Sequence, residues 1–316
     1  MKIISPEQVH AALKYPELVD ALQGAFSKPF TMPPRKVFLL DDEEDSHDAF
    51  AMLPSWNDSM IALKAFTYFP NPQPGYDSLY SKILLFDREH GNPLALVDGT
   101  SVTYWRTAGV SGLASRLLSR EDSQTLLLLG TGNLSTYIIR AQASVRSLKR
   151  IFVWGRTPAN AERVVSQMAT ELEGIEFSTV DDLQAACSEA DIVVSATGSH
   201  EPLVKGAWIK EGTHTDFIGN HHATKRECDT ALIVKSKVYV DSRDNCFKEA
   251  GEVLMPISEG VITETHVVGQ LTEMCTGSVP LRESDREVTL FKSIGMALSD
   301  LVGASCAFRA ATDNSV

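Results

Sequence analysis

The chain has 316 residues, which is enough for about two domains or for one domain with a long insertion. It carries 29 Lys and Arg against 41 Asp and Glu, a net charge of −12, so we expect no polybasic surface for nucleic acid or anionic lipid. Hydrophobic residues make up 43% of the chain, which is typical of a globular protein. Because neither a signal-peptide core nor a run of about 18 apolar residues occurs, we expect a cytoplasmic protein that does not bind membranes.

The five cysteines lack the spacing of a metal site or of a redox pair. They are Cys187, Cys228, Cys246, Cys275 and Cys306. With no CxxC pair and no short Cys/His cluster, we expect no bound metal and interpret them as reduced, mostly structural thiols.

The first third of the chain is predicted to combine two short helices with an antiparallel sheet. Apolar residues recur at helical intervals between positions 9 and 26, after Ser5 as N-cap and Pro6 at the first helical position. Short apolar runs separated by Gly, Pro and Asp turn signals then predict strands. These runs are 36–40, 60–67, 81–86 and 94–97. A helix over about 101–118 is predicted to follow.

From about residue 123 the pattern changes to apolar runs alternating with helical stretches, which is typical of a parallel sheet built from βαβ units. The predicted strands are 125–129, 150–154, 176–179, 192–196, 214–218 and 237–240. Helices are predicted from near Leu134 and, after Pro158, over 161–172. A last helix over 289–309, apolar on one face, should return to the first part of the chain.

These patterns predict an α/β protein in which a doubly wound Rossmann sheet is inserted into an α+β domain. The expected boundaries place residues 120–290 in the Rossmann domain. Residues 1–119 and 291–316 would form the other, discontinuous domain.

A glycine-rich segment follows the first predicted parallel strand. Residues 130–135 read Gly-Thr-Gly-Asn-Leu-Ser, after four leucines and before a predicted helix. Glycines permit a tight turn and let backbone N–H groups approach a pyrophosphate, which the helix N-terminus stabilises. We interpret the segment as a dinucleotide site; the alternative is a glycine turn that serves packing alone. The predicted contacts are Gly130, Gly132, Asn133 and Leu134.

The end of the second parallel strand distinguishes two dinucleotides. NAD sites usually carry Asp or Glu there for the ribose 2′-OH, whereas NADP sites offer Arg and small polar donors to the 2′-phosphate. This chain offers Arg156, Thr157 and Asn160, with no acid. The sequence therefore favours NADPH, with NADH as the other candidate, unless Arg156 is only a solvated side chain.

Two later strand ends should line the nicotinamide side, because ligands of doubly wound sheets lie along the carboxyl ends of the strands. The loops concerned are 195–199 and 218–221. We expect Thr197, Gly198 and Gly219 to act there mainly through backbone and close packing. Each could equally belong to an ordinary strand-to-loop turn.

Several segments together resemble the ornithine cyclodeaminase/mu-crystallin family along nearly the whole chain. These segments are 63–64, 69–71, 84–87, 94–99, 105–108, the Gly-Thr-Gly loop and 291–295. The resemblance implies a homodimer whose dimerisation and substrate domain combines N-terminal residues with the last helix. It also implies a nicotinamide-dependent enzyme acting on small α-amino or α-imino acids.

The resemblance assigns roles to residues that would otherwise be read as surface charges or turn residues. By similarity, Arg35 and Arg106 clamp a substrate carboxylate, for which the guanidinium fork is suited, and Lys64 lies beside the reacting carbon and nitrogen. Thr107 and Ser293, in two of the matching segments, are expected to contact the cofactor.

One position separates the subclasses of this family. The cyclodeaminase and alanine dehydrogenase patterns carry an Asp after the fifth strand, where this chain has His221. That Asp is the expected acid/base for ammonia elimination or water attack, so its absence counts against both reactions, and the ketimine-reducing members also lack it. His221 is interpreted either as a group that exchanges the imine proton with solvent or as a steric or hydrogen-bonding residue.

The expected function is NADPH-dependent reduction of Δ1-pyrroline-2-carboxylate or Δ1-piperideine-2-carboxylate to L-proline or L-pipecolate. Lys64, Arg106 and His221 are the expected catalytic residues. NAD-dependent ornithine cyclodeamination or amino acid dehydrogenation is the alternative within the fold. A non-catalytic, mu-crystallin-like ligand-binding protein is the alternative of another class. No motif ranks the two ring sizes.

Overall fold

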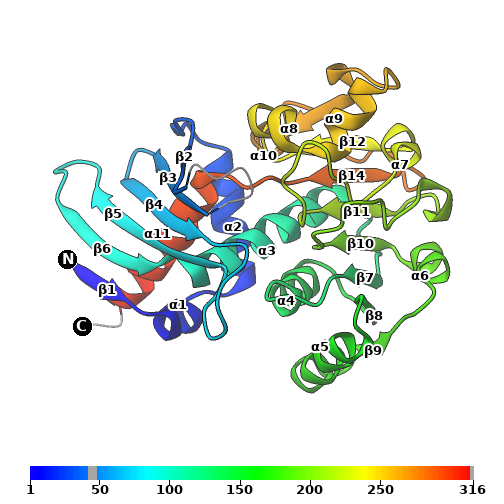
Figure 1. Cartoon of the computed structure of the whole chain (residues 1–316), viewed down its shortest axis with the longest axis horizontal. Coiled ribbons are helices and arrows are strands. Elements are labelled where there is room, and N and C mark those ends of the chain that lie inside the picture. The colour runs from blue at the N-terminus through cyan, green and yellow to red at the C-terminus, as the bar shows by residue number, and fades with distance from the viewer. Residues whose placement is uncertain (42–47, 314–316) are drawn as a thin grey trace. The chain divides into compact units, whose positions relative to one another are not determined.

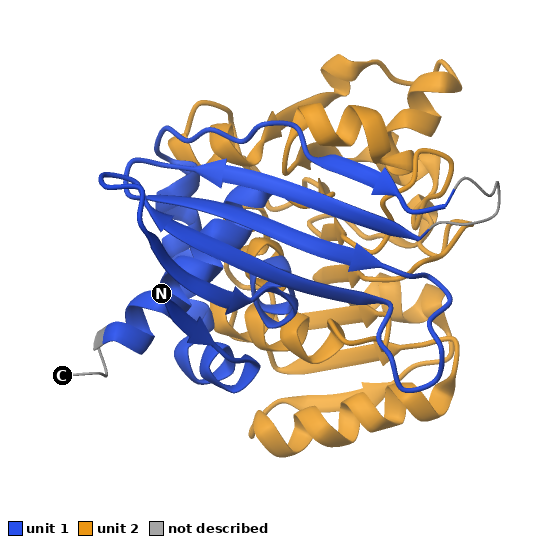
Figure 2. Cartoon of the chain, turned by 60° about the vertical axis from the view of Figure 1, so that its left-hand side comes forward, with its two compact units in different colours: residues 1–107, 296–316 blue, residues 108–295 orange. Residues whose placement is uncertain are grey.

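The computed structural model describes residues 1–41 and 48–313. The chain divides into two compact units, Met1–Thr107 with Met296–Val316, and Ala108–Gly295 (Figure 2). One boundary falls inside α3 (Gly99–Leu118) and the other just before α11 (Ala297–Asp313), where the sequence analysis expected 119/120 and 290/291. Within the described ranges, no helix is both long and apolar enough to cross a bilayer.

The first unit is built on a six-stranded sheet in the order β1-β6-β5-β4-β3-β2, antiparallel except for the β1–β6 pair. Its strands are β1 (Lys2–Ile4), β2 (Lys36–Leu39), β3 (Ala49–Trp56), β4 (Met60–Tyr68), β5 (Leu79–Asp87) and β6 (Pro93–Asp98). Buried residues alternate along β3 and β4, as one covered face requires. The covering helix is α11, which packs against β3, β4 and β5 (Figure 1).

Both N-terminal helices form as predicted, as α1 (Pro6–Ala12) and α2 (Tyr15–Phe26). Ser5 caps α1, because its Oγ accepts from the backbone N of Gln8 and the Gln8 side chain accepts from the backbone N of Ser5. Strands β1 and β3 were not predicted. β1 is only three residues long, and β3 contains Pro54, a residue that weakens a strand prediction.

The second unit is built on an eight-stranded parallel sheet in the order β13-β12-β14-β11-β10-β7-β8-β9. Its strands are β7 (Thr125–Leu129), β8 (Arg150–Trp154), β9 (Glu176–Thr179), β10 (Ile192–Ser195), β11 (His214–Phe217), β12 (Lys237–Val240), β13 (Val267–Gln270) and β14 (Thr289–Lys292). Its further helices are α4 (Ser135–Val145), α5 (Pro158–Glu171), α6 (Leu183–Glu189), α7 (Thr230–Lys235), α8 (Arg243–Glu249), α9 (Gly251–Ser258) and α10 (Leu271–Thr276). The strand order reverses between β7 and β10, the topological switch of a doubly wound Rossmann sheet.

The six predicted parallel strands agree with the structure to within one residue, but the predicted helix over 289–309 is wrong in its first part. Thr289–Lys292 form β14, which pairs with both β11 and β12. All four residues are buried, and a short buried strand has the same apolar pattern as a buried helix segment. Gly295, with φ of 95°, separates this strand from α11.

Candidate active site

In the first unit, two predicted substrate-binding residues meet at a carboxylate that the sequence analysis missed. Lys64 on β4 and Arg106 on α3 both donate to Oδ1 of Asp300 on α11, from Nζ at 2.9 Å and from Nε at 3.0 Å. The Lys64 ammonium also donates to Oγ1 of Thr103 at 2.6 Å. Lys64 is 3% and Asp300 1% exposed, so the structure brings these charges together away from water.

The surroundings of Lys64 in this cluster bring its pKa closer to neutral pH. Burial lowers the pKa of Lys64 to about 8, Asp300 raises it in part, and the nearby Arg106 lowers it. The ammonium is therefore still charged at neutral pH. Because the Nε of Arg106 donates to Asp300, the substrate-carboxylate contact predicted for Arg106 would use its terminal nitrogens.

A sequence signal could have identified Asp300. It lies three residues after Ala297 and four before Ala304, both of which are buried, so it is a charged residue on the apolar face of α11. Oδ2 of Asp300 is buried and has no hydrogen-bond partner among the described residues. Buried charges normally have partners, and this oxygen is therefore a further polar atom that the cluster can offer to a small ligand.

Arg35 lies one residue before β2 and is half-buried. Lys36 pairs with Met52, and Leu53 pairs with Lys64, so the sheet register leads from Lys64 through Leu53 towards Arg35. Two strand spacings correspond to about 10 Å between the backbones of Arg35 and Lys64. The structure thus places Arg35 on the same row of the sheet, and its carboxylate contact stays a prediction.

The glycine loop of the second unit has the conformation that a dinucleotide site requires. Gly130, directly after β7, has φ of 116°, and an added Cβ would lie 2.5 Å from the carbonyl oxygen of Ala196. Gly132 is exposed, with no atom within 4 Å of a Cβ placed there. Leu134 is the N-cap of α4 and provides no side-chain cap, so the positive end of that helix remains available for an anion. These residues fit a pyrophosphate.

The three residues predicted to read the 2′-phosphate are all exposed at the end of β8 and the start of α5. They are Arg156, Thr157 and Asn160. The sequence analysis missed Arg163, whose Nη2 donates to the carbonyl oxygen of Thr131 in the glycine loop at 3.3 Å. Its spacing of three residues from Asn160, which puts both on one face of α5, was the available signal.

The loops that follow β10 and β11 are joined by one fully buried carboxylate. Oε1 of Glu227 accepts from Ser195 Oγ at 2.6 Å and from both the backbone N and Oγ1 of Thr197 at 2.8 Å. Oε2 accepts from the backbone N of Gly219 at 2.9 Å and of Asn220 at 3.1 Å. The sequence analysis named Thr197 and Gly219 but not the residue that holds them.

The remaining predicted residues have different surroundings, and their roles stay predictions. Gly198 and His221 are exposed on the two loops, and Asn133 is exposed in the glycine loop. Ser293 is buried, and its Oγ donates to Asp241 at 2.8 Å. Thr107 is half-buried on α3.

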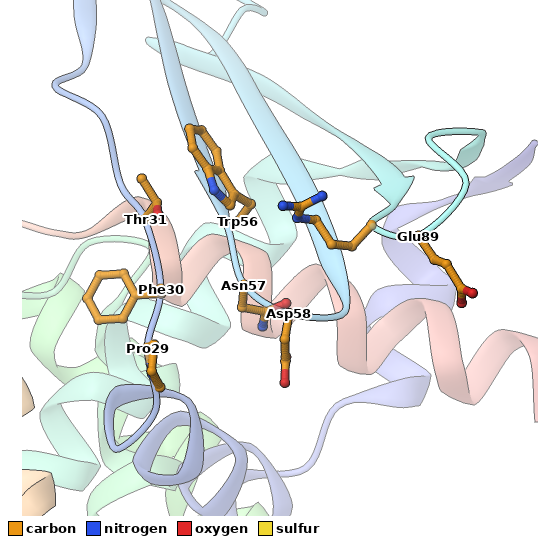
Figure 3. A pocket seen from close by; sticks show the side chains of 8 residues that line it. Pro29, Phe30, Thr31, Trp56, Asn57, Asp58 and Glu89 are labelled. Atoms are coloured by element: carbon orange, nitrogen blue, oxygen red, sulfur yellow. The ribbon is translucent and has the colours of Figure 1, made fainter.

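A separate hollow of about 630 Å³ lies in the first unit around the turn between β3 and β4 (Figure 3). Its lining residues are Pro29, Phe30, Thr31, Trp56, Asn57, Asp58, Arg88 and Glu89. Asn57 stabilises the turn by accepting from the backbone N of Ser59 and of Met60. The hollow includes none of the predicted site residues.

The family model of the ornithine cyclodeaminase/mu-crystallin family matches residues 2–314 of the chain. The chain belongs to this family. Its relatives include a Delta(1)-pyrroline-2-carboxylate reductase of Colwellia psychrerythraea, which is 48% identical over 307 residues, 96% of this chain and 97% of the relative.

Solved structures of similar chains cover the whole molecule. The Delta(1)-pyrroline-2-carboxylate reductase of Thermococcus litoralis, in complex with NADH and L-proline, has a TM-score of 0.93 at 33% identity and covers 100% of this chain and 99% of its own. An archaeal alanine dehydrogenase dimer with bound NAD has a TM-score of 0.91 at 28% identity, covering 100% and 97%. The resemblance, the fold class and the prediction of an NAD(P)H-dependent oxidoreductase are thereby confirmed.

Proposed function

We propose that this member of the family reduces Δ1-pyrroline-2-carboxylate to L-proline with NADPH, and accepts Δ1-piperideine-2-carboxylate as a second substrate. The observation that carries the proposal is the buried cluster of Lys64, Arg106 and Asp300. Two cations and one carboxylate leave one positive charge, which suits a small carboxylate substrate. The relatives named as Delta(1)-pyrroline-2-carboxylate reductases support the same reaction.

Within this proposal, the basic cluster binds and orients the substrate. Arg106 holds the carboxylate through the nitrogens that Asp300 does not use, and Lys64 and Arg35 add donors. Fixing the carboxylate fixes the neighbouring C2, the carbon that accepts the hydride. When bound, the nicotinamide cofactor supplies that hydride. A lysine with a pKa of about 8 can also hold a proton close to the ring nitrogen at neutral pH.

The electrophile in this reaction is the protonated imine, and it receives no water or ammonia. An acid/base for elimination is therefore not required after β11, where the chain has His221. The exposure of His221 supports exchange of the imine proton with solvent.

The preference for NADPH rests on the residues after β8. Arg156 pairs with the 2′-phosphate in this proposal, Thr157 and Asn160 donate to it, and their exposure leaves them accessible to the cofactor. NADH is the second donor, since solved relatives are described with NADH or NAD. Gly130, Gly132, Asn133 and Leu134 hold the pyrophosphate; Thr107, Thr197, Gly198, Gly219 and Ser293 are the further cofactor contacts.

We also propose that the chain is a homodimer through its first unit. Edge strand β2 and the residue after it expose four consecutive apolar side chains, Val37, Phe38, Leu39 and Leu40, at 45–66%. Such an edge is a liability in a monomer. The archaeal alanine dehydrogenase is described as a dimer. Light scattering should give a mass twice the 34.6 kDa of one chain. Replacing Leu39 by a charged residue should reduce the measured mass to that of one chain.

The test of function supplies four substrates in parallel. Δ1-pyrroline-2-carboxylate, Δ1-piperideine-2-carboxylate and pyruvate with ammonia are followed by NADPH absorbance. Ornithine with NAD is followed by the release of ammonia, because cyclodeamination returns NAD unchanged. We expect oxidation of NADPH with the two cyclic imines and little change in the other arms. No oxidation with either imine overturns the proposal, and turnover of ornithine or pyruvate instead identifies the alternative within the family.

A further inference from the structure

Glu227 and three other polar residues of the second unit form a closed ring of contacts. Nζ of Lys292, at the end of β14, donates to the carbonyl oxygen of Asn220 at 2.8 Å and lies 3.0 Å from Oε2 of Glu252. Oε1 of Glu252 accepts from the backbone N of Glu227 at 3.0 Å, and Oε2 of Glu227 accepts from the backbone N of Asn220 at 3.1 Å. The ring therefore fixes the backbone and the side chain of Glu227 together.

Burying the charged groups of this ring in a protein interior has a large cost in desolvation free energy. Glu227, Glu252 and Lys292 are each 0% exposed, and burial raises the pKa of Glu227 against the opposing effect of Lys292. Apolar residues of similar volume often stabilise a core as well as a buried ion network does. A polar network whose buried charges are paired instead imposes one arrangement on the groups that it joins.

The groups that Glu227 joins are the two loops at the carboxyl ends of neighbouring strands β10 and β11. One of its oxygens holds the first loop at Thr197, and the other holds the second loop at Gly219 and Asn220. The loops also touch directly, because a Cβ on Gly219 would lie 2.1 Å from the backbone N of Thr197. At this edge of a doubly wound sheet, a small displacement of either loop changes the shape offered to a ligand.

We propose that Glu227 is a positioning residue that holds the loops after β10 and β11 in one arrangement for the nicotinamide ring. The inference rests on the proposed function, which places the nicotinamide of the cofactor beside these loops. Glu227 acts through Thr197, Gly219 and Asn220 and does not itself contact substrate or cofactor.

The test replaces Glu227 by Gln. The amide has nearly the same shape, but its NH2 group must face either Ser195 and Thr197 or the two backbone N–H groups, all of which are donors to Glu227. Glu227→Gln should weaken binding of both NADH and NADPH by about tenfold or more, measured by quenching of cofactor fluorescence. Glu264→Gln, at an exposed position, is the control with the same loss of charge.

A second readout separates positioning from loss of folded protein. At saturating cofactor, Glu227→Gln should lower kcat and increase the isotope effect with NADPH deuterated at the transferred position, because hydride transfer becomes more strongly rate-limiting. A smaller folded fraction would lower kcat with an unchanged isotope effect. Cofactor affinity, kcat and isotope effect all within twofold of the parent values overturn the proposal.

A milder variant covers the case in which Glu227→Gln does not fold. Ser195→Ala removes one donor to Glu227 and leaves the other four. It should weaken cofactor binding about threefold and speed amide hydrogen exchange in residues 196–199 and 218–221; no change in either measurement overturns the proposal. Cofactor binding needs no imine, so the inference is judged even if the proposed reaction fails.

Discussion

Lys64 and Asp300 form an ion pair of 2.9 Å whose two side chains are only 4% and 2% exposed. Arg106 donates to the same oxygen of Asp300. Because hydration is almost absent, the carboxylate strongly influences how easily Lys64 loses its proton. Asp300 therefore helps to keep Lys64 charged, against the effect of burial, and holds the Nε side of the Arg106 guanidinium.

Asp300→Asn should narrow the pH range of activity from the alkaline side. Asp300 raises the pKa of Lys64, whereas burial and Arg106 lower it, so removing the carboxylate lowers a pKa that is already about 8. In the proposed reaction, carboxylate binding requires protonated Lys64, so activity is lost as pH rises through this pKa, and in the variant the loss begins at lower pH. At neutral pH we expect kcat/KM for the imine to fall about 100-fold.

The measurement is the pH profile of kcat/KM, with exposed Asp244→Asn as the control. An alkaline limb at the same pH in Asp300→Asn and in the parent enzyme would show that Asp300 does not control Lys64.

Arg106→Lys keeps the charge but removes both Nε and the planar fork. Lysine cannot hold Asp300 and a carboxylate with separate nitrogens in fixed geometry, so we expect kcat/KM for the imine to fall about 100-fold while cofactor affinity stays constant. Arg309→Lys, exposed on α11, is the matched control. Equal activity of Arg106→Lys and the parent enzyme would exclude bidentate binding by Arg106.

Most of the parallel sheet could be predicted because each strand is a short apolar run next to a turn or helix signal. β7, with five buried residues before Gly130, is the clearest case. β14 could not be predicted, since Thr289–Lys292 contains two apolar residues between Thr and Lys and joins the sheet between strands that precede it in the chain. Only tertiary contacts distinguish it from the start of α11.

The two glycines of the cofactor loop should respond differently to alanine. Gly130→Ala places a Cβ 2.5 Å from Ala196 O at φ of 116°, so we expect the free energy of unfolding to fall by about 1–3 kcal/mol and cofactor binding to be lost. Gly132→Ala meets no atom and should leave the unfolding free energy unchanged while weakening cofactor binding about tenfold. Thermal unfolding and fluorescence titration check both. Tight binding by Gly132→Ala would contradict the pyrophosphate assignment.

Alanine variants of Arg156 and Arg163 should differ in how they affect the KM values for NADPH and NADH. Arg156→Ala should raise the KM for NADPH about 10-fold to 100-fold and leave the KM for NADH unchanged, since only NADPH carries the 2′-phosphate. Arg163→Ala should affect both cofactors alike, because Arg163 contacts the glycine loop at Thr131. Steady-state kinetics with both cofactors measure the four values, and an unchanged KM for NADPH in Arg156→Ala would contradict the assignment.

The candidate site could be predicted in part, and the missing residues share one property. Lys64, Arg106 and the glycine loop belong to segments that match a family, whereas Asp300 and Glu227 act on other side chains and backbone groups. Glu227 lies in a loop between β11 and α7, far in sequence from Ser195, so its partners depend on the fold. A single buried carboxylate has no spacing pattern that identifies its partners.

The most direct test of the proposed reaction follows the transferred hydrogen. The enzyme would be incubated with Δ1-pyrroline-2-carboxylate and NADPH deuterated at the transferred C4 position, and the product analysed by mass spectrometry and chiral chromatography. Hydride transfer to C2 predicts L-proline with one deuterium at Cα and one NADPH oxidised per proline formed. Failure to form proline, or proline without deuterium, would contradict imine reduction by this enzyme.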